Sequence, residues 1–328
     1  MRQSAALLPC LFFFAAILLS GCGRETDAPP PAAESPAAPA APPEVELITR
    51  EVLFGNPERA SVQISPDGTT LSWVAPREGV MNVWVAPVGD LAAARAVTAD
   101  TGRGIRNHFW SYRPGTLLYV RDSGGDENFH LFAVELASGE SRDLTPFAAT
   151  TASVVGLSHR HPDAVLVGMN DRDPQWHDLY RVDLRDGTRS LVEKNEQRIG
   201  QYLADGELQP RFAVRSRPDG GADVLQRKGD AWVPFDSIGF EDSLTTGPVG
   251  LSDDGATLYL RDSRERDTSA MFALDVASGA RSLLHQDARA DVGDWLADPV
   301  TGRVQAVSVN YLRDEWTAVD DAIRADLH

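Results

Sequence analysis

Cysteine is nearly absent from this 328-residue sequence, which contains only Cys10 and Cys22. Both lie near the start of the chain, so the remaining residues have no cysteine with which to form a disulfide. Helical patterning is also scarce, because few segments place apolar residues at i, i+3 and i+4. A solenoid of helix pairs is therefore excluded, and the folded part must be stabilised by packed β-sheets.

Two functional motifs are also missing. The Gly-x-Ser-x-Gly turn that presents a serine nucleophile in α/β-hydrolases does not occur. The nearest segments, "GLSHR" (Gly156–Arg160) and "GLSDD" (Gly250–Asp254), lack the second glycine. The Gly-His and Trp-Asp signatures of WD repeats are absent as well. We therefore assign no catalytic residue, metal site or cofactor from the sequence.

A short phrase recurs along the chain. "LSDDGATLYLRDS" (Leu251–Ser263) has the spacing of "SYRPGTLLYVRDS" (Ser111–Ser123), and "SPDGTTLSWVA" (Ser65–Ala75) repeats its first half. In each copy, glycine with aspartate or proline favours a tight turn. An alternating apolar segment follows, which is typical of a strand. Each copy therefore predicts a β-hairpin.

Two series of equivalent positions give the period of this repeat. The serines that begin the turns are Ser65, Ser111, Ser158 and Ser252, separated by 46, 47 and 94 residues. A downstream series consists of Val83, Leu131, Leu179, Leu225 and Met271, separated by 48, 48, 46 and 46 residues. A unit of about 46 residues with four short strands is typical of a β-propeller blade. The sequence predicts an all-β propeller with six of an expected seven units, of which at least five are complete four-stranded blades and the sixth is incomplete.

The N-terminus has a different composition. "LLPCLFFFAAILLSGC" ends in Leu19-Ser20-Gly21-Cys22 and resembles the lipobox of bacterial lipoproteins. That resemblance implies cleavage before Cys22 and attachment of lipid to its thiol; the alternative is an ordinary signal peptide with a chance cysteine. We expect a signal peptide over 1–21, a disordered Pro/Ala-rich tether over 22–43 and the propeller over 44–328.

These features indicate a location and exclude one class of partner. A lipidated Cys22 would anchor the protein in the bacterial cell envelope, and Gly23 in place of an aspartate favours the outer membrane, facing the periplasm. The formal net charge of the chain is −17. Such a charge argues against nucleic acid or anionic lipid as a partner of the folded part.

The loops between the second and third strands of the units are rich in charge of both signs. They include "DSGGDENFH" (Asp122–His130), "DRDPQWHD" (Asp171–Asp178) and "DSRERDTSA" (Asp262–Ala270). Equivalent loops of a propeller emerge on one face, so these form either a solvated face or a docking and gating face. The candidate docking or substrate-gating residues are Asp126, Glu127, Asn128, His130, Arg172, Arg264 and Arg266.

A calcium-binding site is an alternative interpretation of "DSGGDENFH", because Asp122, Asp126 and Glu127 lie close together. The segment lacks the longer ligand series and the terminal bidentate glutamate of an EF-hand loop. We therefore favour a hairpin loop at this position.

A resemblance to a known family becomes specific at this point. "FGNPERASVQISPDGTTLSWVAP", "YVRDSGGDENFHLFAVELASGESRDLTPF" and "GMNDRDPQWHDLYRVDLRDGTRSLV" together resemble the N-terminal half of the prolyl oligopeptidase family of serine peptidases, in its bacterial dipeptidyl and acylaminoacyl peptidase branch. The resemblance extends from about Leu53 to Asp320. It implies a seven-bladed propeller followed by an α/β-hydrolase domain that carries a Ser-Asp-His triad.

The resemblance leads to two expectations about function. The first is a substrate-gating propeller, truncated before the catalytic domain and inactive alone. Its partners would be an α/β-hydrolase domain, short peptides and the membrane through its lipid anchor. The alternative is a stand-alone lipoprotein propeller that binds a protein or peptide. No residue of the chain matches the family's nucleophile, acid or base, so no catalytic role is carried over.

Overall fold

The computed structural model describes residues 47–327. The predicted signal peptide, Cys22 and the tether lie outside the described residues. The chain divides into two units, 1–53 and 54–328. The one α-helix of the described residues, α1 (Arg50–Phe54), begins in the first unit and was not expected from the sequence. No helix in the described part is long and apolar enough to span a membrane.

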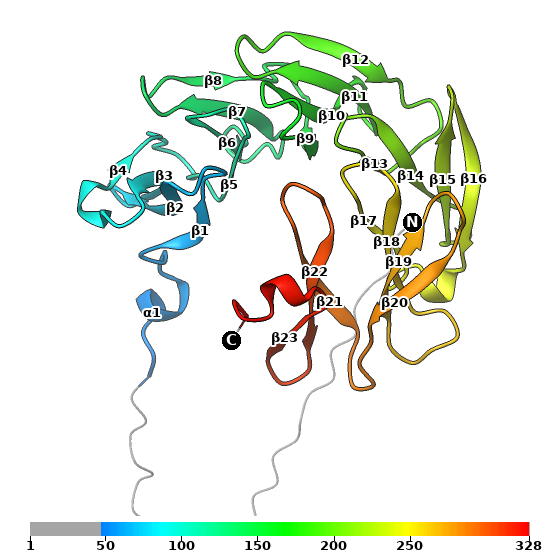
Figure 1. Cartoon of the computed structure of the whole chain (residues 1–328). Coiled ribbons are helices and arrows are strands. Elements are labelled where there is room, and N and C mark those ends of the chain that lie inside the picture. Colours follow the sequence, from blue (N-terminus) through cyan, green and yellow to red (C-terminus); the bar gives the residue numbers. More distant parts are fainter. Residues whose placement is uncertain (1–46, 328) are drawn as a thin grey trace, which may run out of the picture. The chain divides into compact units, whose positions relative to one another are not determined.

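The second unit consists of antiparallel sheets that follow one another along the chain, as predicted (Figure 1). Blade 1 contains β1 (Ala60–Ile64), β2 (Thr70–Arg77), β3 (Val80–Pro87) and β4 (Arg95–Ala96). Blade 2 contains β5 (Asn107–Trp110), β6 (Thr116–Arg121), β7 (His130–Glu135) and β8 (Ser141–Asp143). Blade 3 contains β9 (Ala152–Leu157), β10 (Ala164–Asp173), β11 (Trp176–Asp183) and β12 (Arg189–Glu193).

The remaining blades include the most diverged repeat. Blade 4 contains β13 (Gln201–Ala204), β14 (Pro210–Ser216), β15 (Ala222–Lys228) and β16 (Ala231–Ile238). Blade 5 contains β17 (Gly247–Leu251), β18 (Thr257–Asp262), β19 (Ala270–Asp275) and β20 (Arg281–His285). Blade 6 contains β21 (Val292–Ala297), β22 (Val304–Asn310) and β23 (Asp314–Ala318). The prediction of five complete blades and an incomplete sixth is confirmed, since the last sheet has three strands.

Two of the three copies of the repeated phrase form the same hydrogen-bonded turn. Ser65 and Ser252 each accept a backbone hydrogen bond on Oγ from the residue five positions later, at 3.0 and 2.8 Å. Each serine also donates to the aspartate two residues on, at 2.5 and 2.6 Å. The glycine that follows has a φ of +72° in both turns, which a side chain would disfavour. The local sequence therefore determines where the first and second strands of a blade meet.

The strands of each blade run alternately up and down, so their connections fall on two faces. The turns between first and second strands lie on one face, which we call the turn face. The loops between second and third strands lie on the other, which we call the loop face, together with the connections from each blade to the next. Because the candidate residues lie in or beside second-to-third loops, the fold places them on the loop face.

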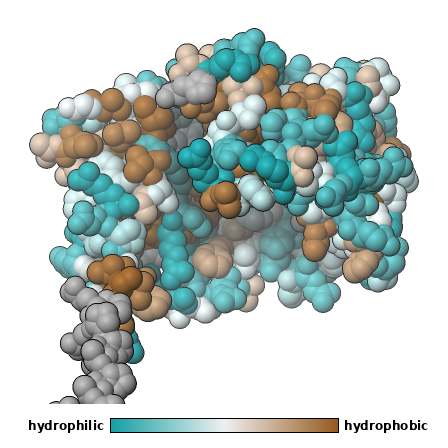
Figure 2. Space-filling model, turned by 90° about the horizontal axis from the view of Figure 1, so that it is seen from below, coloured by the Kyte–Doolittle hydropathy of each residue, from teal (hydrophilic) through white to brown (hydrophobic). Residues whose placement is uncertain are grey.

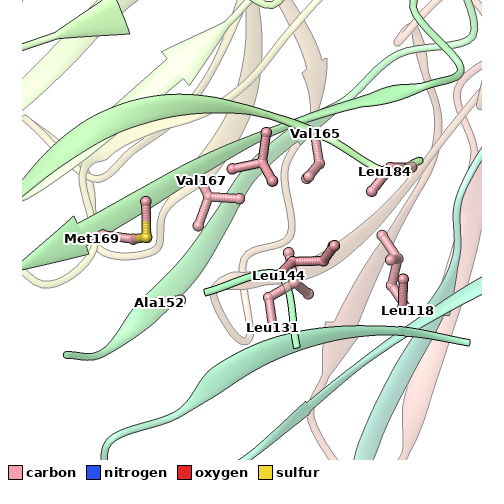
Figure 3. Packing of buried hydrophobic residues seen from close by; sticks show 10 residues of the cluster. Leu118, Leu131, Leu144, Ala152, Val165, Val167, Met169 and Leu184 are labelled. Carbon is pink, nitrogen blue, oxygen red and sulfur yellow. The ribbon is translucent and has the colours of Figure 1, made fainter. Parts of the chain in front are cut away.

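Apolar side chains fill the space between neighbouring blades. Leu118 and Leu131 of blade 2 face Val165, Val167 and Met169 of blade 3 (Figure 3), and all five have a relative exposure of 0%. These residues lie on the second and third strands of their sheets, β6, β7 and β10, and every second residue of a strand points to the same side. This packing holds the loops of blades 2 and 3 in fixed positions relative to each other.

Blades 1 to 5 follow an arc, and the hairpin formed by β21 and β22 extends into its middle (Figure 1). The space-filling view shows a hollow in the face seen from below, with hydrophilic and hydrophobic residues at its rim (Figure 2).

Candidate functional site

Hydrogen bonds hold the loop between β6 and β7 in a defined shape. Gly124 and Gly125 have φ values of +65° and +90°. The Asp126 carboxylate accepts hydrogen bonds from the backbone of Ser123 and Asn128, both at 3.1 Å. The Asn128 side chain donates to the same carboxylate and lowers the pKa of Asp126 below its usual value. Asp126 and Asn128 therefore shape the loop.

Glu127 lies at the apex of this loop with a φ of +59°, a region that a residue with a side chain occupies at a cost. Its backbone N–H donates to Asp122 at 3.4 Å, and its carbonyl accepts from the hydroxyl of Thr151 in blade 3 at 3.3 Å. Among the described residues, no hydrogen bond or ion pair engages its exposed carboxylate. The loop thus fixes the Glu127 backbone and leaves its charge available.

A cavity of about 630 Å³ opens beside Glu127, between blades 2 and 3. Phe109, Val120, Phe129 and Val154 form its apolar wall. Its charged rim consists of Arg103, Arg106, Arg121, Asp122 and Glu127. An apolar cavity with a few charged groups at its mouth is typical of a small-ligand site.

Ion pairs hold most of this rim. Arg121 donates to Asp100 at 2.7 Å, and Arg103 lies 3.6 Å from Asp122. Burial raises the pKa of Asp100, but hydrogen bonds from the Gly104 backbone and from Arg121 outweigh it and hold that pKa below its usual value. Within the described residues, Arg106 and Glu127 have no ionic partner, so one free cation and one free anion flank the cavity.

The lining offers binding groups and no catalytic constellation. Its hydroxyls come from Thr151 and Ser153, and it includes neither histidine nor cysteine. A serine nucleophile needs a base within hydrogen-bond reach, and among the described residues no hydrogen bond joins either hydroxyl to a carboxylate or a histidine. The cavity can hold a ligand that combines charge with an apolar group.

The other predicted residues are distributed around the blades. His130 begins β7 and its Nδ1 lies 2.7 Å from Asp143 of the same blade. Arg172 donates to Asp178 at 2.7 Å from both Nε and Nη2. These side chains lie in blades 2 and 3 but not in the lining of the cavity beside Glu127.

Arg264 and Arg266 lie in the equivalent loop of blade 5. Arg264 donates to Asp262 of its own blade and to Asp236 of blade 4, at 2.7 to 3.2 Å. Arg266 donates to Gln286 at 3.2 Å and covers the ring of Phe272. The structure therefore groups Asp126, Glu127 and Asn128 in one loop and does not bring Arg172, Arg264 or Arg266 to it.

Exposed apolar residues on the loop face were missed by the sequence analysis. Their exposed fractions are 90% for Leu244, 88% for Leu312, 67% for Phe240, 52% for Tyr311 and 41% for Phe129. All lie in second-to-third loops or in the connection between blades 4 and 5, which includes η2 (Phe240–Asp242). The sequence contained a signal for these residues, because they are apolar and occur in loops that are otherwise charged. Such residues are typical of an interaction surface when they gather on one face.

Comparisons with known proteins agree with the fold and the motifs. No protein-family model matches the chain. Dipeptidyl aminopeptidase BIII of Pseudoxanthomonas mexicana is 65% identical over 283 residues, which are 86% of this chain and 41% of that protein. Dipeptidyl peptidase family member 6 of Caenorhabditis elegans is 26% identical over 303 residues, 86% of this chain and 40% of that protein. The chain thus spans about two fifths of the length of these relatives.

A solved structure shows the same architecture. The β-propeller domain of the Trilobed protease from Pyrococcus furiosus superposes with a TM-score of 0.52, covering 80% of this chain and 82% of that one. Its sequence identity of 16% supports the fold alone. The chain is therefore a β-propeller that is homologous over 86% of its length to a dipeptidyl aminopeptidase, in agreement with the family resemblance of its sequence motifs.

Proposed function

We propose that this chain is the substrate-gating propeller of a dipeptidyl peptidase-like protein. The observation that carries the proposal is its 65% identity to a dipeptidyl aminopeptidase over 86% of the chain. In this role the propeller filters peptides and an α/β-hydrolase domain cleaves them. The propeller supplies no nucleophile of its own, so we expect it to be inactive without the α/β-hydrolase domain.

The loop face suits the docking of such a domain. It combines the cavity beside Glu127 with the exposed side chains of Phe240, Leu244, Tyr311 and Leu312. A domain seated there would bury the apolar residues and cover the mouth of the cavity. In that arrangement the uncommitted charges of Glu127 and Arg106 would contact the polar ends of a bound peptide, and the apolar wall would contact its side chains.

Reconstitution tests this function. The purified chain is mixed with the part of the dipeptidyl aminopeptidase relative that it does not match, and hydrolysis of dipeptidyl p-nitroanilides is measured. We expect turnover in the mixture, none with the chain alone, and no fluorophosphonate adduct on the chain alone. Cleavage of short peptides and exclusion of folded proteins would support gating. An adduct on a serine of this chain would overturn the proposal.

A substitution tests whether the cavity beside Glu127 binds the peptide. Glu127→Gln removes the free charge, so we expect a higher KM for dipeptidyl substrates in the mixture and an unchanged kcat. Glu265→Gln is the matched control, because Glu265 occupies the equivalent loop of blade 5 with a φ of +60°. Equal effects of the two substitutions would show that the cavity beside Glu127 is not the peptide site. Binding of a protein partner by the chain without turnover in the mixture would favour a stand-alone binding propeller.

We also propose that the protein is anchored by lipid on Cys22, which lies outside the described residues. The Leu-Ser-Gly-Cys sequence supports this assignment. Cys22→Ser should abolish metabolic labelling with palmitate and release the protein from the membrane fraction. Unchanged labelling and fractionation would contradict the lipobox.

A further inference from the structure

The tip of the β21–β22 hairpin, Asp298–Arg303, lies in the middle of the arc formed by blades 1 to 5 (Figure 1). It belongs to the turn face. Its neighbours are the first-to-second turns of blade 2, Ser111–Gly115, and of blade 5, Ser252–Ala256. These two turns come from blades that are not adjacent in the arc, so the tip connects blades that do not otherwise follow one another.

Backbone contacts join the tip to blade 5. The Asp253 N–H donates to the Thr301 carbonyl at 2.9 Å. Gly302 has a φ of +68°, and a Cβ on this residue would lie 2.9 Å from the Leu251 carbonyl oxygen and 3.2 Å from the Ser252 Cα. Both distances are to backbone atoms, which cannot move aside as the end of a side chain can. The tip therefore approaches blade 5 as closely as only glycine allows.

A side-chain contact joins the tip to blade 2. The Tyr112 hydroxyl donates to the Pro299 carbonyl at 2.5 Å. Burial, with the nearby charges of Asp253 and Asp298, raises the pKa of Tyr112, so its hydroxyl stays protonated and remains a donor. The Tyr112 ring also packs edge-on against His159 of blade 3, with ring centroids 6.0 Å apart.

Asp253 links the same region to two more blades. Arg160 of blade 3 forms an ion pair with Asp253 and a second with Glu207 of blade 4 at 3.0 Å. The Gly206 N–H of blade 4 donates to the Asp253 carbonyl at 2.7 Å. The turns of blades 2 to 6 are thus joined directly across the turn face.

We propose that the β21–β22 tip is a plug that closes the middle of the arc at the turn face. A cavity of about 660 Å³ is lined mainly by the first strands of blades 3, 4 and 5, and its lining includes Leu251, whose carbonyl lies against Gly302 of the tip. With the plug seated, a ligand reaches this interior from the loop face. That the ligand is a peptide rests on the proposed function, whereas the seating of the plug does not.

Pyrene fluorescence tests the seating in the full chain. Cysteines replace the exposed residues Pro114 in the blade 2 turn and Val300 in the tip, in a background with Cys10→Ser and Cys22→Ser, and both are labelled with pyrene maleimide. Two pyrenes emit as an excimer only when their rings touch. We expect strong excimer emission from the protein and a several-fold lower ratio of excimer to monomer emission with Gly302→Ala.

A matched glycine provides the control. Gly279, in the turn between β19 and β20, has a φ of +74° and open space where a Cβ would be, so Gly279→Ala imposes the same backbone strain without the contact. It should keep the excimer. Tyr112→Phe removes one hydrogen bond and should lower the excimer without altering the fold. Absence of an excimer in the parent protein, or equal emission from Gly302→Ala and Gly279→Ala, would overturn the plug whatever the peptidase assay shows.

Discussion

Arg172 holds the carboxylate of Asp178 with two hydrogen bonds of 2.7 Å, although the Asp178 side chain is 1% exposed. The backbone N–H of Asn195 donates to the same carboxylate at 2.8 Å. Asp178 is therefore a buried charge whose main ionic partner lies partly in solvent. Arg172 was a candidate gating residue in the sequence analysis. The structure shows that its side chain pairs with a buried carboxylate.

Replacing this arginine should destabilise blade 3. Arg172→Ala leaves the Asp178 carboxylate buried with its hydrogen bonds incomplete, and we expect unfolding to be easier by roughly 2–3 kcal/mol. Urea unfolding followed by circular dichroism measures the change. Lys194→Ala is the control, because the exposed pair of Lys194 and Glu196 should contribute almost nothing. Equal stability of Arg172→Ala and the parent would leave gating as the better explanation of this arginine.

Acid should weaken blade 5. Burial raises the pKa of Asp262, but hydrogen bonds from Arg264 and Arg281 outweigh it and lower the pKa to about 2, from 3.8. A lowered carboxylate pKa contributes stability above pH 3.8, and this contribution, about 2 kcal/mol, is lost as the pH falls from 3.8 to 2. Asp262→Asn should remove that part of the acid dependence of the unfolding free energy. If the unfolding free energy of the parent and of Asp262→Asn changed equally with pH between 3.8 and 2, this prediction would be wrong.

A second acid dependence should occur at higher pH. His108 of β5 is buried, its Nε2 lies 2.9 Å from the Ser72 hydroxyl of blade 1, and burial lowers its pKa to about 4, from 6.5. The unfolded chain binds a proton near pH 6.5 and the folded chain only near pH 4. Stability should therefore fall by roughly 3 kcal/mol as the pH drops through this window. His108→Gln should flatten the curve there; if it does not, the histidine is protonated in the folded state.

The strain at Glu127 predicts opposite effects on stability and binding. A left-handed residue with a side chain is disfavoured, so Glu127→Gly should stabilise the fold by about 1 kcal/mol while it weakens the proposed peptide site. Glu265→Gly relieves the same strain in blade 5 and should raise the melting temperature without changing KM in the reconstituted mixture. A loss of stability in Glu127→Gly would mean that its side chain contributes to the fold.

The repeat allowed the architecture to be predicted because each blade is specified locally. The turn that begins at Ser65 or Ser252 needs only its own serine, aspartate and glycine. Leu225 located the diverged blade 4 by spacing, and it lies on β15 as that spacing requires. Short-range hydrogen bonds and alternation therefore carry most of the information about the sheets.

The candidate site was harder to predict from the sequence, because it depends on contacts between blades. Nothing in the local sequence shows that Thr151 bonds to the Glu127 carbonyl or that Phe109 and Val154 face the same cavity. Likewise, the charges of Arg172 and Arg264 indicated a solvated or docking loop, whereas both side chains pair with aspartates that precede or follow them in the blades. A charge pattern in the sequence shows which residues are charged, but not which of them form ion pairs within the fold.

The order of the strands also bears on how the chain acquires its structure during synthesis. Every sheet is assembled from consecutive strands, so each blade can form from a segment that has just emerged, and such local contacts favour fast folding. The hydrogen bond from Tyr112 to Pro299 is different, because it spans 187 residues. Blades 1 to 5 are synthesised before the β21–β22 hairpin, so we expect the nascent protein to pass through a stage in which the middle of its arc is not yet closed by the tip of that hairpin.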